Sequence, residues 1–294
     1  MAQTALNVVS APFYADALSV ARVMQPEEAV FCFSAERLRG RLQLFTAGFP
    51  GTVSFAVKSN PSREVVTALA EAGLTHWDVA SVQEMALVHA IQPAAHFHYH
   101  NPVKSRREIH NAYHKFGCRR FAVDAREEVA KIAEIVGEDR SVEMAVRFVL
   151  PRDRASSAHD FSTKFGAPEH IAIELLQDIS RRGFMPVMTF HPGSQSRDPN
   201  VYVRHIEAAH RIAKSAGVHI GKLNVGGGFP SIYPGMTPPD MSLYFSTIHD
   251  ATRDLIKTHG CQLLAETGRA AGAISESFKG RLYDSAVKAY DSIH

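Results

Sequence analysis

Val53-Ser-Phe-Ala-Val-Lys58 is a short apolar run that ends in a lysine, and Asn60-Pro61 follows soon after it. Its length and its β-branched and aromatic residues are typical of a buried strand. Because Pro61 cannot continue the hydrogen-bond ladder of a sheet, we expect the strand to end before it. Lys58 is therefore predicted to lie at the carboxyl end of a buried strand.

Seven further runs of this kind follow, with helical patterns between them. Regular alternation of strands and helices indicates a parallel sheet, and eight such units indicate a closed barrel. We therefore predict an α/β protein with a (β/α)8 TIM-type barrel, whose chemistry lies where the strands end. The expected strands are 53–57, 76–80, 96–99, 121–123, 144–150, 185–190, 223–225 and 263–265.

Two helix starts are also expected from the sequence. Ser81 lies three residues before Glu84, and Asp124 lies three residues before Glu127. At this spacing the short side chain and the Glu can each bond a free backbone N–H of the first turn. Ser81 and Asp124 are therefore predicted to cap helices that begin just after strands.

Composition narrows the class of protein. Of 294 residues, 45% are hydrophobic and 21% charged, which is ordinary for a globular protein. Lys and Arg number 32 against 30 Asp and Glu, so we expect no nucleic-acid partner. The sequence shows no secretory signal and no apolar run long enough for a bilayer, so we expect a cytoplasmic protein with no membrane partner. Cys32, Cys118 and Cys261 are expected to be reduced and mostly buried.

Two features could carry chemistry at the ends of the predicted strands. Lys58 could form a Schiff base with an aldehyde, or could simply point into water. Gly226-Gly-Gly-Phe-Pro230 directly follows a strand. Consecutive glycines let backbone amides approach a phosphate, although a tight turn would also explain them.

Two more features lie at the same end of the predicted barrel. His191-Pro-Gly-Ser194 follows the sixth strand, and Glu266-Thr-Gly-Arg269 follows the eighth. A carboxylate beside a pyridine nitrogen keeps that nitrogen protonated, and an imidazole can stack on the ring. Taken singly, Glu266 and Arg269 could instead be a surface ion pair, and His191 a histidine satisfied within the rim. All four features meet at one end of one barrel, which favours a shared site.

Six motifs occur in order between residues ~50 and 272: Ala-Val-Lys-x-Asn, Asp-x-Ala-Ser, Lys-Phe-Gly, His-x-Gly-Ser, Gly-Gly-Gly-Phe-Pro and Glu-x-Gly-Arg. In them the chain resembles the ornithine/lysine/diaminopimelate decarboxylase family, the type III decarboxylases that depend on pyridoxal phosphate (PLP). The resemblance implies a barrel of the alanine racemase/ornithine decarboxylase kind. The sequence departs from the family's usual pattern at Pro192 and Thr267.

The resemblance also implies a role for each matching residue. Lys58 would carry the cofactor, and Asp78 and Glu84 would lie beneath it; for Glu84, capping is an equally good explanation. The remaining residues would surround the ring and phosphate: Arg147 in the network on the pyridine side, His191 stacked on the ring, Ser194, Gly226, Gly227, Gly228 and Arg269 at the phosphate, and Glu266 at the ring nitrogen. Lys58, His191 and Glu266 would be the catalytic residues.

The glycine motif resembles the ornithine and lysine branch more than the diaminopimelate branch. We therefore expect a decarboxylase of a basic amino acid, ornithine first and lysine second, in polyamine biosynthesis. A diaminopimelate decarboxylase of lysine biosynthesis, a non-catalytic PLP carrier and a regulatory barrel protein remain alternatives. The family resemblance implies a homodimer for the full-length form.

His96-Phe-His-Tyr-His100 places three imidazoles on one face of a strand, which could bind zinc. An ordinary barrel strand is the preferred interpretation, because no carboxylate or cysteine partner is evident nearby in the sequence. We therefore expect no metal.

The predicted domains are an N-terminal segment at 1–34, a PLP-binding barrel at 35–270, and a tail at 271–294. The tail is expected to be either the start or a remnant of a β-domain. In the family that domain supplies a catalytic Cys and a substrate-binding Asp, and no Cys follows Cys261 here. We therefore expect residues 1–294 alone to bind PLP but to turn over basic amino acids at least ~100-fold more slowly than a full-length relative.

Overall fold

The computed structural model describes residues 14–25, 33–151, 165–231 and 240–272. Residues 35–273 form one compact unit. Outside it, the structure describes the short helix α1 (Ala17–Met24), which Asp16 caps by accepting a hydrogen bond from the backbone N–H of Ser19. The predicted tail at 271–294 lies outside the described residues beyond Gly272, and so does Cys32. Cys118 and Cys261 are buried free thiols, as expected.

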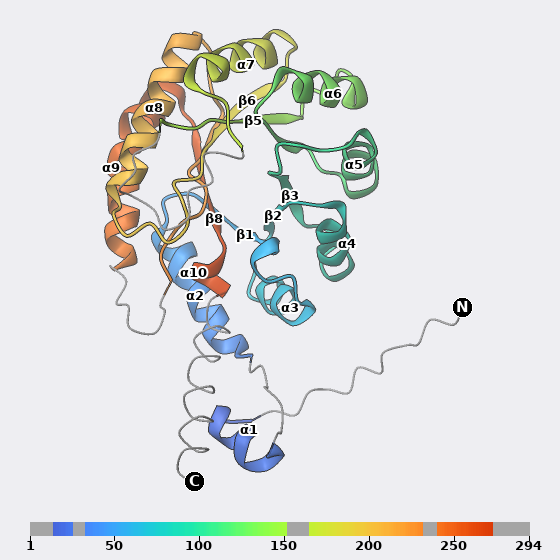
Figure 1. Cartoon of the computed structure of the whole chain (residues 1–294), viewed down its shortest axis with the longest axis vertical. Coiled ribbons are helices and arrows are strands. Elements are labelled where there is room, and N and C mark those ends of the chain that lie inside the picture. Colours follow the sequence, from blue (N-terminus) through green and yellow to red (C-terminus); the bar gives the residue numbers. More distant parts are fainter. Residues whose placement is uncertain (1–13, 26–32, 152–164, 232–239, 273–294) are drawn as a thin grey trace, which may run out of the picture. The chain divides into compact units, whose positions relative to one another are not determined.

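Eight parallel strands close into a barrel in chain order, which confirms the predicted fold (Figure 1). The closing pair is β1 with β8, in a register that places Val53 beside Ala265 and Ser54 beside Glu266. Each predicted strand is present, with ends that differ by up to three residues. The strands are β1 (Thr52–Ala56), β2 (His76–Val79), β3 (His96–Tyr99), β4 (Arg120–Val123), β5 (Glu143–Arg147), β6 (Met185–Thr189), β7 (Lys222–Asn224) and β8 (Gln262–Thr267).

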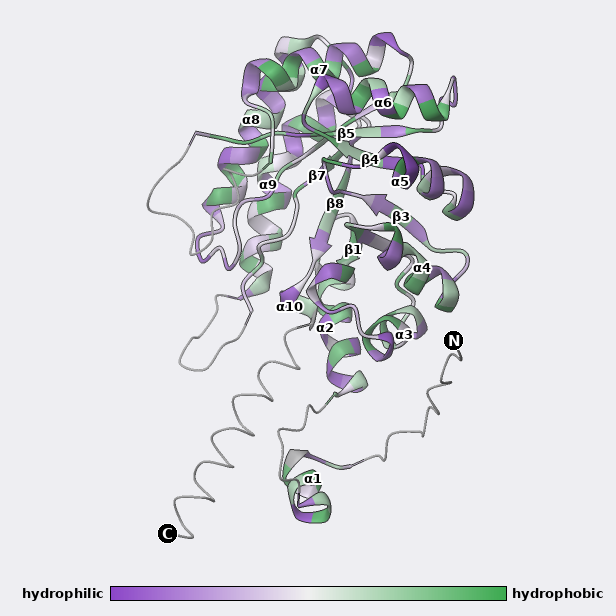
Figure 2. Cartoon of the chain, turned by 45° about the vertical axis from the view of Figure 1, so that its right-hand side comes forward, coloured by the Kyte–Doolittle hydropathy of each residue, from purple (hydrophilic) through white to green (hydrophobic). Residues whose placement is uncertain are grey.

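Helices surround the strands and bury one face each. In Figure 2 the barrel helices carry both hydrophilic and hydrophobic surface, and the buried residues of α8 include Ile206 and Ile212. None of the helices that the structure describes is long and apolar enough to cross a membrane. The α-helices of this unit are α2 (Ala35–Gly48), α3 (Arg63–Glu71), α4 (Val82–Ile91), α5 (Arg106–His110), α6 (Arg126–Val136), α7 (Glu169–Arg181), α8 (Asn200–Ala216), α9 (Met241–His259) and α10 (Arg269–Gly272). A short 3-10 helix, η1 (Val57–Ser59), follows β1, and a short π-helix, η2 (Asn111–Lys115), follows α5.

The two faces of each strand have different surroundings. Trp77 of β2 is fully buried against α4, where its indole N–H donates to the side chain of Gln92 at 2.8 Å. Because side chains alternate along a strand, His76 and Asp78 on either side of Trp77 point into the barrel. The interior of this barrel is therefore polar along β2.

A polar cluster fills the end of the barrel where the strands begin. Glu143, the first residue of β5, pairs with Lys222 of β7 at 2.6 Å and with Arg120 of β4 at 3.5 Å. Beside it, His76 Nδ1 and His98 Nε2 lie 2.9 Å apart, so one of the two nitrogens donates a hydrogen bond to the other. The histidines of β2 and β3 thus continue this polar layer toward the opposite end.

One of the two predicted helix caps is confirmed and the other is wrong. Ser81 accepts a hydrogen bond from the backbone N–H of Glu84 at 3.2 Å, as expected. Asp124 does not cap α6, because its carboxylate accepts from the backbone N–H of Gly166 at 2.9 Å. Ala125 is the N-cap residue of α6 and provides no side-chain bond. A contact between segments 42 residues apart therefore displaced a local one.

The buried histidines predict how stability depends on pH. Burial, together with the charge of His100, holds the pKa of His98 well below its usual value. The unfolded chain therefore takes up a proton at His98 as pH falls through about 6.5, whereas the folded chain does not. We expect the free energy of unfolding to decrease as pH falls below about 6.5, with a slope of up to about 1.4 kcal/mol per pH unit from this one group.

Denaturant unfolding between pH 4.5 and 7.5 tests this expectation. His98→Asn should show a shallower pH dependence than the wild type, whereas the exposed control His249→Asn should not. Parallel curves for the wild type and His98→Asn would refute the assignment.

Candidate active site

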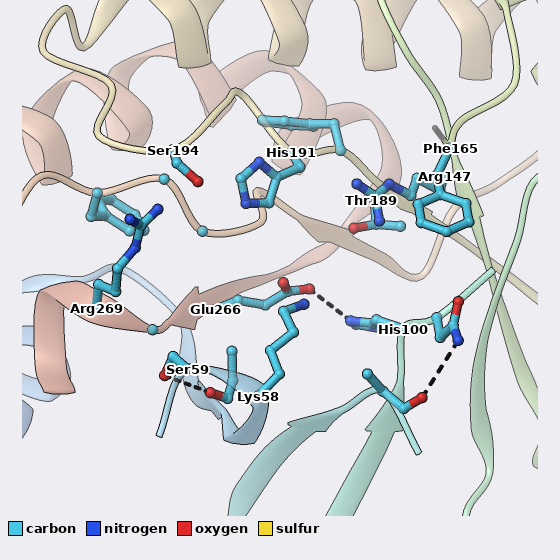
Figure 3. Close-up of a pocket in the computed structure, with 18 of the residues that line it drawn as sticks. Lys58, Ser59, His100, Arg147, Phe165, Thr189, His191, Ser194, Glu266 and Arg269 are labelled. Carbon is cyan, nitrogen blue, oxygen red and sulfur yellow. Dashed lines mark hydrogen bonds and ion pairs between the residues drawn. The ribbon is translucent and has the colours of Figure 1, made fainter. Parts of the chain in front are cut away.

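A cavity of about 630 Å³ lies at the carboxyl end of the strands (Figure 3). Most of the predicted site residues line it: Lys58, Arg147, His191, Ser194, Gly227, Gly228, Glu266 and Arg269. Asp78, Glu84 and Gly226 are not among its lining residues but bond to groups near it. The tertiary structure therefore brings the ends of seven strands, β1, β2, β3, β5, β6, β7 and β8, to one cavity.

Lys58 occupies the short turn η1 directly after β1, and its side chain faces the cavity with 53% of its surface exposed. Its amine donates to Oδ2 of Asp78 at 3.4 Å, and Asp78 is almost fully buried. The charge of Asp78 raises the pKa of Lys58 against the opposing effect of burial, and Glu266 adds to the rise. Figure 3 shows the amine pointing toward the carboxylate of Glu266.

Glu84 serves the start of α4. Its carboxylate accepts from the backbone N–H of Ala80 at 2.8 Å, while its own backbone N–H donates to Ser81. Burial raises its pKa, and the bond to Ala80 works in the opposite direction. This geometry accounts for Glu84 as part of a helix cap, and its role beneath a cofactor stays a prediction.

Two of the three glycines after β7, Gly226 and Gly228, pack against the loop after β6, backbone to backbone. A Cβ on Gly226 would lie 2.1 Å from the carbonyl oxygen of Phe190, and one on Gly228 would lie 2.2 Å from that of Gly193. Both glycines also have positive φ, +69° and +87°, a conformation that other residues rarely adopt. The structure therefore requires glycine at these two positions, and the close approach shapes one wall of the cavity.

His191 is held as a neutral imidazole in that wall. Its Nδ1 accepts from the backbone N–H of Gly193 at 3.1 Å, so in the neutral ring the proton is on Nε2. Burial, followed by the charge of Arg147, lowers the pKa of His191 to about 4. Figure 3 shows the ring at the cavity, above Lys58 and Glu266, where it could stack on a flat ligand.

Arg147 and Arg269 give the cavity positive charge from two sides. Arg147, at the end of β5, lies with its guanidinium carbon 5.6 Å from the centre of the Phe165 ring, close enough for a cation–π contact. Arg269 begins α10, two residues after Thr267, the last residue of β8. With Lys58, these side chains make the cavity suited to an anionic ligand.

Glu266 is held by two residues that the sequence analysis did not predict. His100 Nδ1 lies 2.7 Å from Oε1 of Glu266, and Nδ2 of Asn224 donates to the same oxygen at 2.6 Å. The signal in the sequence was weak. His100 directly follows β3, two residues after the inward-pointing His98, and Asn224 is the last residue of the short strand β7. Which carboxylate they would face could not be told from the sequence, because β3, β7 and β8 are distant along the chain.

The structure separates the three histidines considered for zinc. His96 is exposed, His98 pairs with His76, and His100 reaches Glu266. No carboxylate lies near this trio in the sequence, but β2 and β8 bring Asp78 and Glu266 to His100 in the fold. Within the described residues, Asp78, His100 and Glu266 are the group whose ligand atoms come within 4.8 Å of one another, close enough to hold a metal ion.

A family model for the pyridoxal-binding domain of pyridoxal-dependent decarboxylases matches residues 35–273. The lysine/ornithine decarboxylase of Selenomonas ruminantium is 36% identical over 184 residues, which are 60% of this chain and 45% of that protein. Antizyme inhibitor 2 of Xenopus laevis is 29% identical over 229 residues, 73% of this chain and 46% of that protein. The chain thus spans about half the length of these relatives.

A solved structure has the same barrel and holds the expected cofactor. The complex of SrLDC with PLP and cadaverine superposes with a TM-score of 0.74 at 28% identity, covering 88% of this chain and 65% of that one. At this level of similarity, the two chains share the arrangement of strands.

Gly226 and Gly228, packed against the loop after β6, form what we call the glycine wall of the cavity. This wall leads to a prediction about anion binding. Gly228→Ala places a methyl group against the backbone of Gly193, so we expect the wall to shift and binding of inorganic phosphate or PLP to weaken at least ~10-fold. Gly217→Ala is a matched control, because Gly217 has a similar φ of +63° but open space around its Cβ. It should cost only the backbone strain of a left-handed residue, about 1–2 kcal/mol, and leave binding intact.

Calorimetric titration of both variants, with thermal unfolding measured in parallel, checks this. Equal binding by the two variants would show that the glycine wall does not contact the anion.

Proposed function

The chain belongs to the pyridoxal-dependent decarboxylase family and contains its pyridoxal-binding domain, and on this premise we propose that it decarboxylates a basic amino acid. In this reaction the amino acid takes up one proton and yields one amine and one molecule of carbon dioxide. Ornithine is the first candidate substrate, in polyamine biosynthesis, and lysine is the second.

One observation carries the proposal: Lys58 and Glu266 share one cavity, from strands that the barrel closure makes neighbours. Ser54 of β1 is in register with Glu266 of β8, and Lys58 lies four residues after Ser54, in η1. The Lys58 amine and the Glu266 carboxylate are thereby neighbours in one space, where the amine would serve an aldehyde and the carboxylate a ring nitrogen. Neither side chain would serve this chemistry alone.

The residues fit the cofactor on features of the structure itself. Oδ1 of Asp78 is buried and accepts no hydrogen bond within the described part of the chain, although His100 lies 3.4 Å away. The glycine wall and Arg269 suit a phosphate group. PLP, when bound, supplies an aldehyde that an amine can join and a ring that takes up the electron pair left by carbon dioxide.

The chain's own residues would divide the work as follows. The Lys58 amine would attach the cofactor, and Asp78 beneath it would hold the charge of that amine. Neutral His191 would lie against the ring, since an uncharged imidazole does not repel a protonated pyridine. Ser194, Gly226 to Gly228 and Arg269 would hold the phosphate, with Arg147 on the pyridine side and Glu266 at the ring nitrogen.

The choice of ornithine and lysine rests on the sequence motif and on the relatives. Gly226 to Pro230 follows the ornithine and lysine pattern, one relative is named a lysine/ornithine decarboxylase, and SrLDC was solved with cadaverine. Cadaverine is the amine that lysine decarboxylation yields. Diaminopimelate is the alternative substrate.

A second candidate function is regulatory. The observation that favours it is the match to antizyme inhibitor 2, whose name describes an inhibitor of another protein. The geometry around Lys58 favours the enzyme, because a regulatory barrel has no chemical need of an amine paired with Asp78 inside a cavity lined by two arginines. We also retain the homodimer and the cytoplasmic location as parts of this proposal, to be tested by sedimentation and by cell fractionation.

The first test is covalent capture of the cofactor. Incubation with PLP and reduction with borohydride should add one phosphopyridoxyl group, and mass spectrometry should locate it on the peptide containing Lys58. Lys58→Ala should lose the group, whereas the control Lys257→Ala, an exposed lysine of α9, should keep it. Wild-type protein that remains unlabelled would overturn the cofactor assignment.

The second test concerns the substrate. With PLP bound, carbon dioxide release from carboxyl-labelled ornithine and lysine should exceed release from labelled diaminopimelate, and Lys58→Ala should release none above the cofactor alone. Release from diaminopimelate only would move the protein to the other branch. PLP capture without release from any of the three would favour the carrier or regulatory alternative.

A further inference from the structure

A column of imidazoles runs inside the barrel toward the cavity. His98 of β3 and His100, the residue directly after β3, are two positions apart and both point inward, and His76 of β2 pairs with His98. The rings of His98 and His100 lie 5.5 Å apart, centre to centre. His100 is the end of this column at the cavity and is the imidazole that touches the predicted catalytic carboxylate.

A proton must lie between His100 and Glu266. The distance of 2.7 Å between Nδ1 and Oε1 is a hydrogen-bond distance, and two unprotonated atoms would repel each other at that separation. Asn224 donates its amide to the same oxygen, and its own carbonyl accepts from the backbone N–H of Gly226 at 2.8 Å, which fixes the orientation of the amide. Both donors therefore reach Oε1, and Oε2 is the oxygen that can face a ligand.

His100 lies between two buried carboxylates. Its Nδ1 is 3.4 Å from Oδ1 of Asp78 as well as 2.7 Å from Glu266, and the side chains of all three residues are less than 10% exposed. Two carboxylates this close and this buried do not both ionise unless cations or hydrogen-bond donors balance them. Lys58 provides that balance for Asp78, and His100 provides it for Glu266.

The direction of the pKa shifts agrees with this division. Burial and the charge of Glu266 raise the pKa of Asp78, against the effect of Lys58. Burial would also raise the pKa of Glu266, but the hydrogen bond and charge of His100, with Lys58 and His191, outweigh it and lower that pKa. Glu266 is therefore the more acidic carboxyl group of the pair.

We propose that His100 is a positioning residue for Glu266: its Nδ1–H holds Oε1, compensates the charge of the buried carboxylate, and leaves Oε2 toward the place of the cofactor's ring nitrogen. The proposal rests on the proposed function. A weakly basic carboxylate leaves the shared proton on the ring nitrogen, whereas a strongly basic one would take it. The groups that face His100 are Asp78 from β2, His98 on its own strand, Asn224 from β7 and Glu266 from β8.

The test uses the full chain loaded with PLP labelled with nitrogen-15 in its ring, and NMR reports whether that nitrogen is protonated. At pH 8 the wild type should give the protonated signal and His100→Ala the unprotonated one, the same change as in Glu266→Gln. His100→Asn can place an amide N–H near the position of Nδ1 and should restore the wild-type signal. His96→Ala, at the exposed start of the same strand, is the control and should not differ from wild type.

PLP should still be captured on Lys58 in His100→Ala, so loss of the signal is not loss of the cofactor. If His100→Ala keeps the wild-type signal, the proposal is overturned. It is also overturned if treatment of the wild type with EDTA produces the unprotonated signal and added Zn²⁺ reverses it, because a metal ion would then join Asp78, His100 and Glu266 in place of a proton.

A second measurement separates this proposal from the proposed function, because it needs no cofactor. In protein labelled with carbon-13 at the glutamate carboxyl groups, the signal of Glu266 is identified by its absence in Glu266→Gln. In cofactor-free protein, Glu266 should take up its proton at a higher pH in His100→Ala than in the wild type. Identical titrations of Glu266 in the two proteins would overturn the proposal for His100 even if PLP binds. Failure of the wild type to capture PLP would instead overturn the proposed decarboxylase function, and the titration would still decide whether His100 acts on Glu266.

Discussion

Two carboxylates buried side by side at one end of a barrel are the constraint on which this site depends. Removing a charge from water is costly unless an opposite charge or hydrogen-bond donors compensate it. Asp78 has Lys58 at 3.4 Å, and Glu266 has His100 at 2.7 Å and Asn224 at 2.6 Å. The positions of the amine and the imidazole at the rim of the cavity follow from this balance of charge.

The closed barrel supplies the geometry for that balance. Because β8 pairs with β1, Glu266 and Lys58 become neighbours although they lie at opposite ends of the barrel sequence. The interior behind them is also polar, with the pairing of His76 with His98 and the cluster around Glu143. Many barrels fill this space with branched apolar side chains. Here hydrogen bonds and ion pairs fill it, which gives the acidic pair a polar second layer rather than an apolar one.

Backbone contacts set the shape of the cavity on the opposite side. Gly226 and Gly228 allow the loop after β7 to touch the loop after β6, where any Cβ would meet a carbonyl oxygen. Tyr202 and Ser196 complete this wall by bonding the carbonyls of Gly227 and Gly228 at 2.8 and 2.9 Å. A rigid wall made of backbone complements the charged side chains across the cavity, since backbone amides bind an anion without carrying a charge that must itself be balanced.

The sequence by itself determined the eight strands, the barrel and the position of Lys58 at a strand end, because apolar runs, proline and glycine act over a few neighbouring residues. It also predicted that Ser81 caps α4, a contact three residues long. It failed for Asp124, whose carboxylate bonds Gly166, and it could not assign His100 or Asn224 to Glu266. These contacts join strands that are far apart in the chain. Only the tertiary structure decided them, because the closure and register of the barrel select which inward side chains meet, and local sequence patterns carry no information about that register.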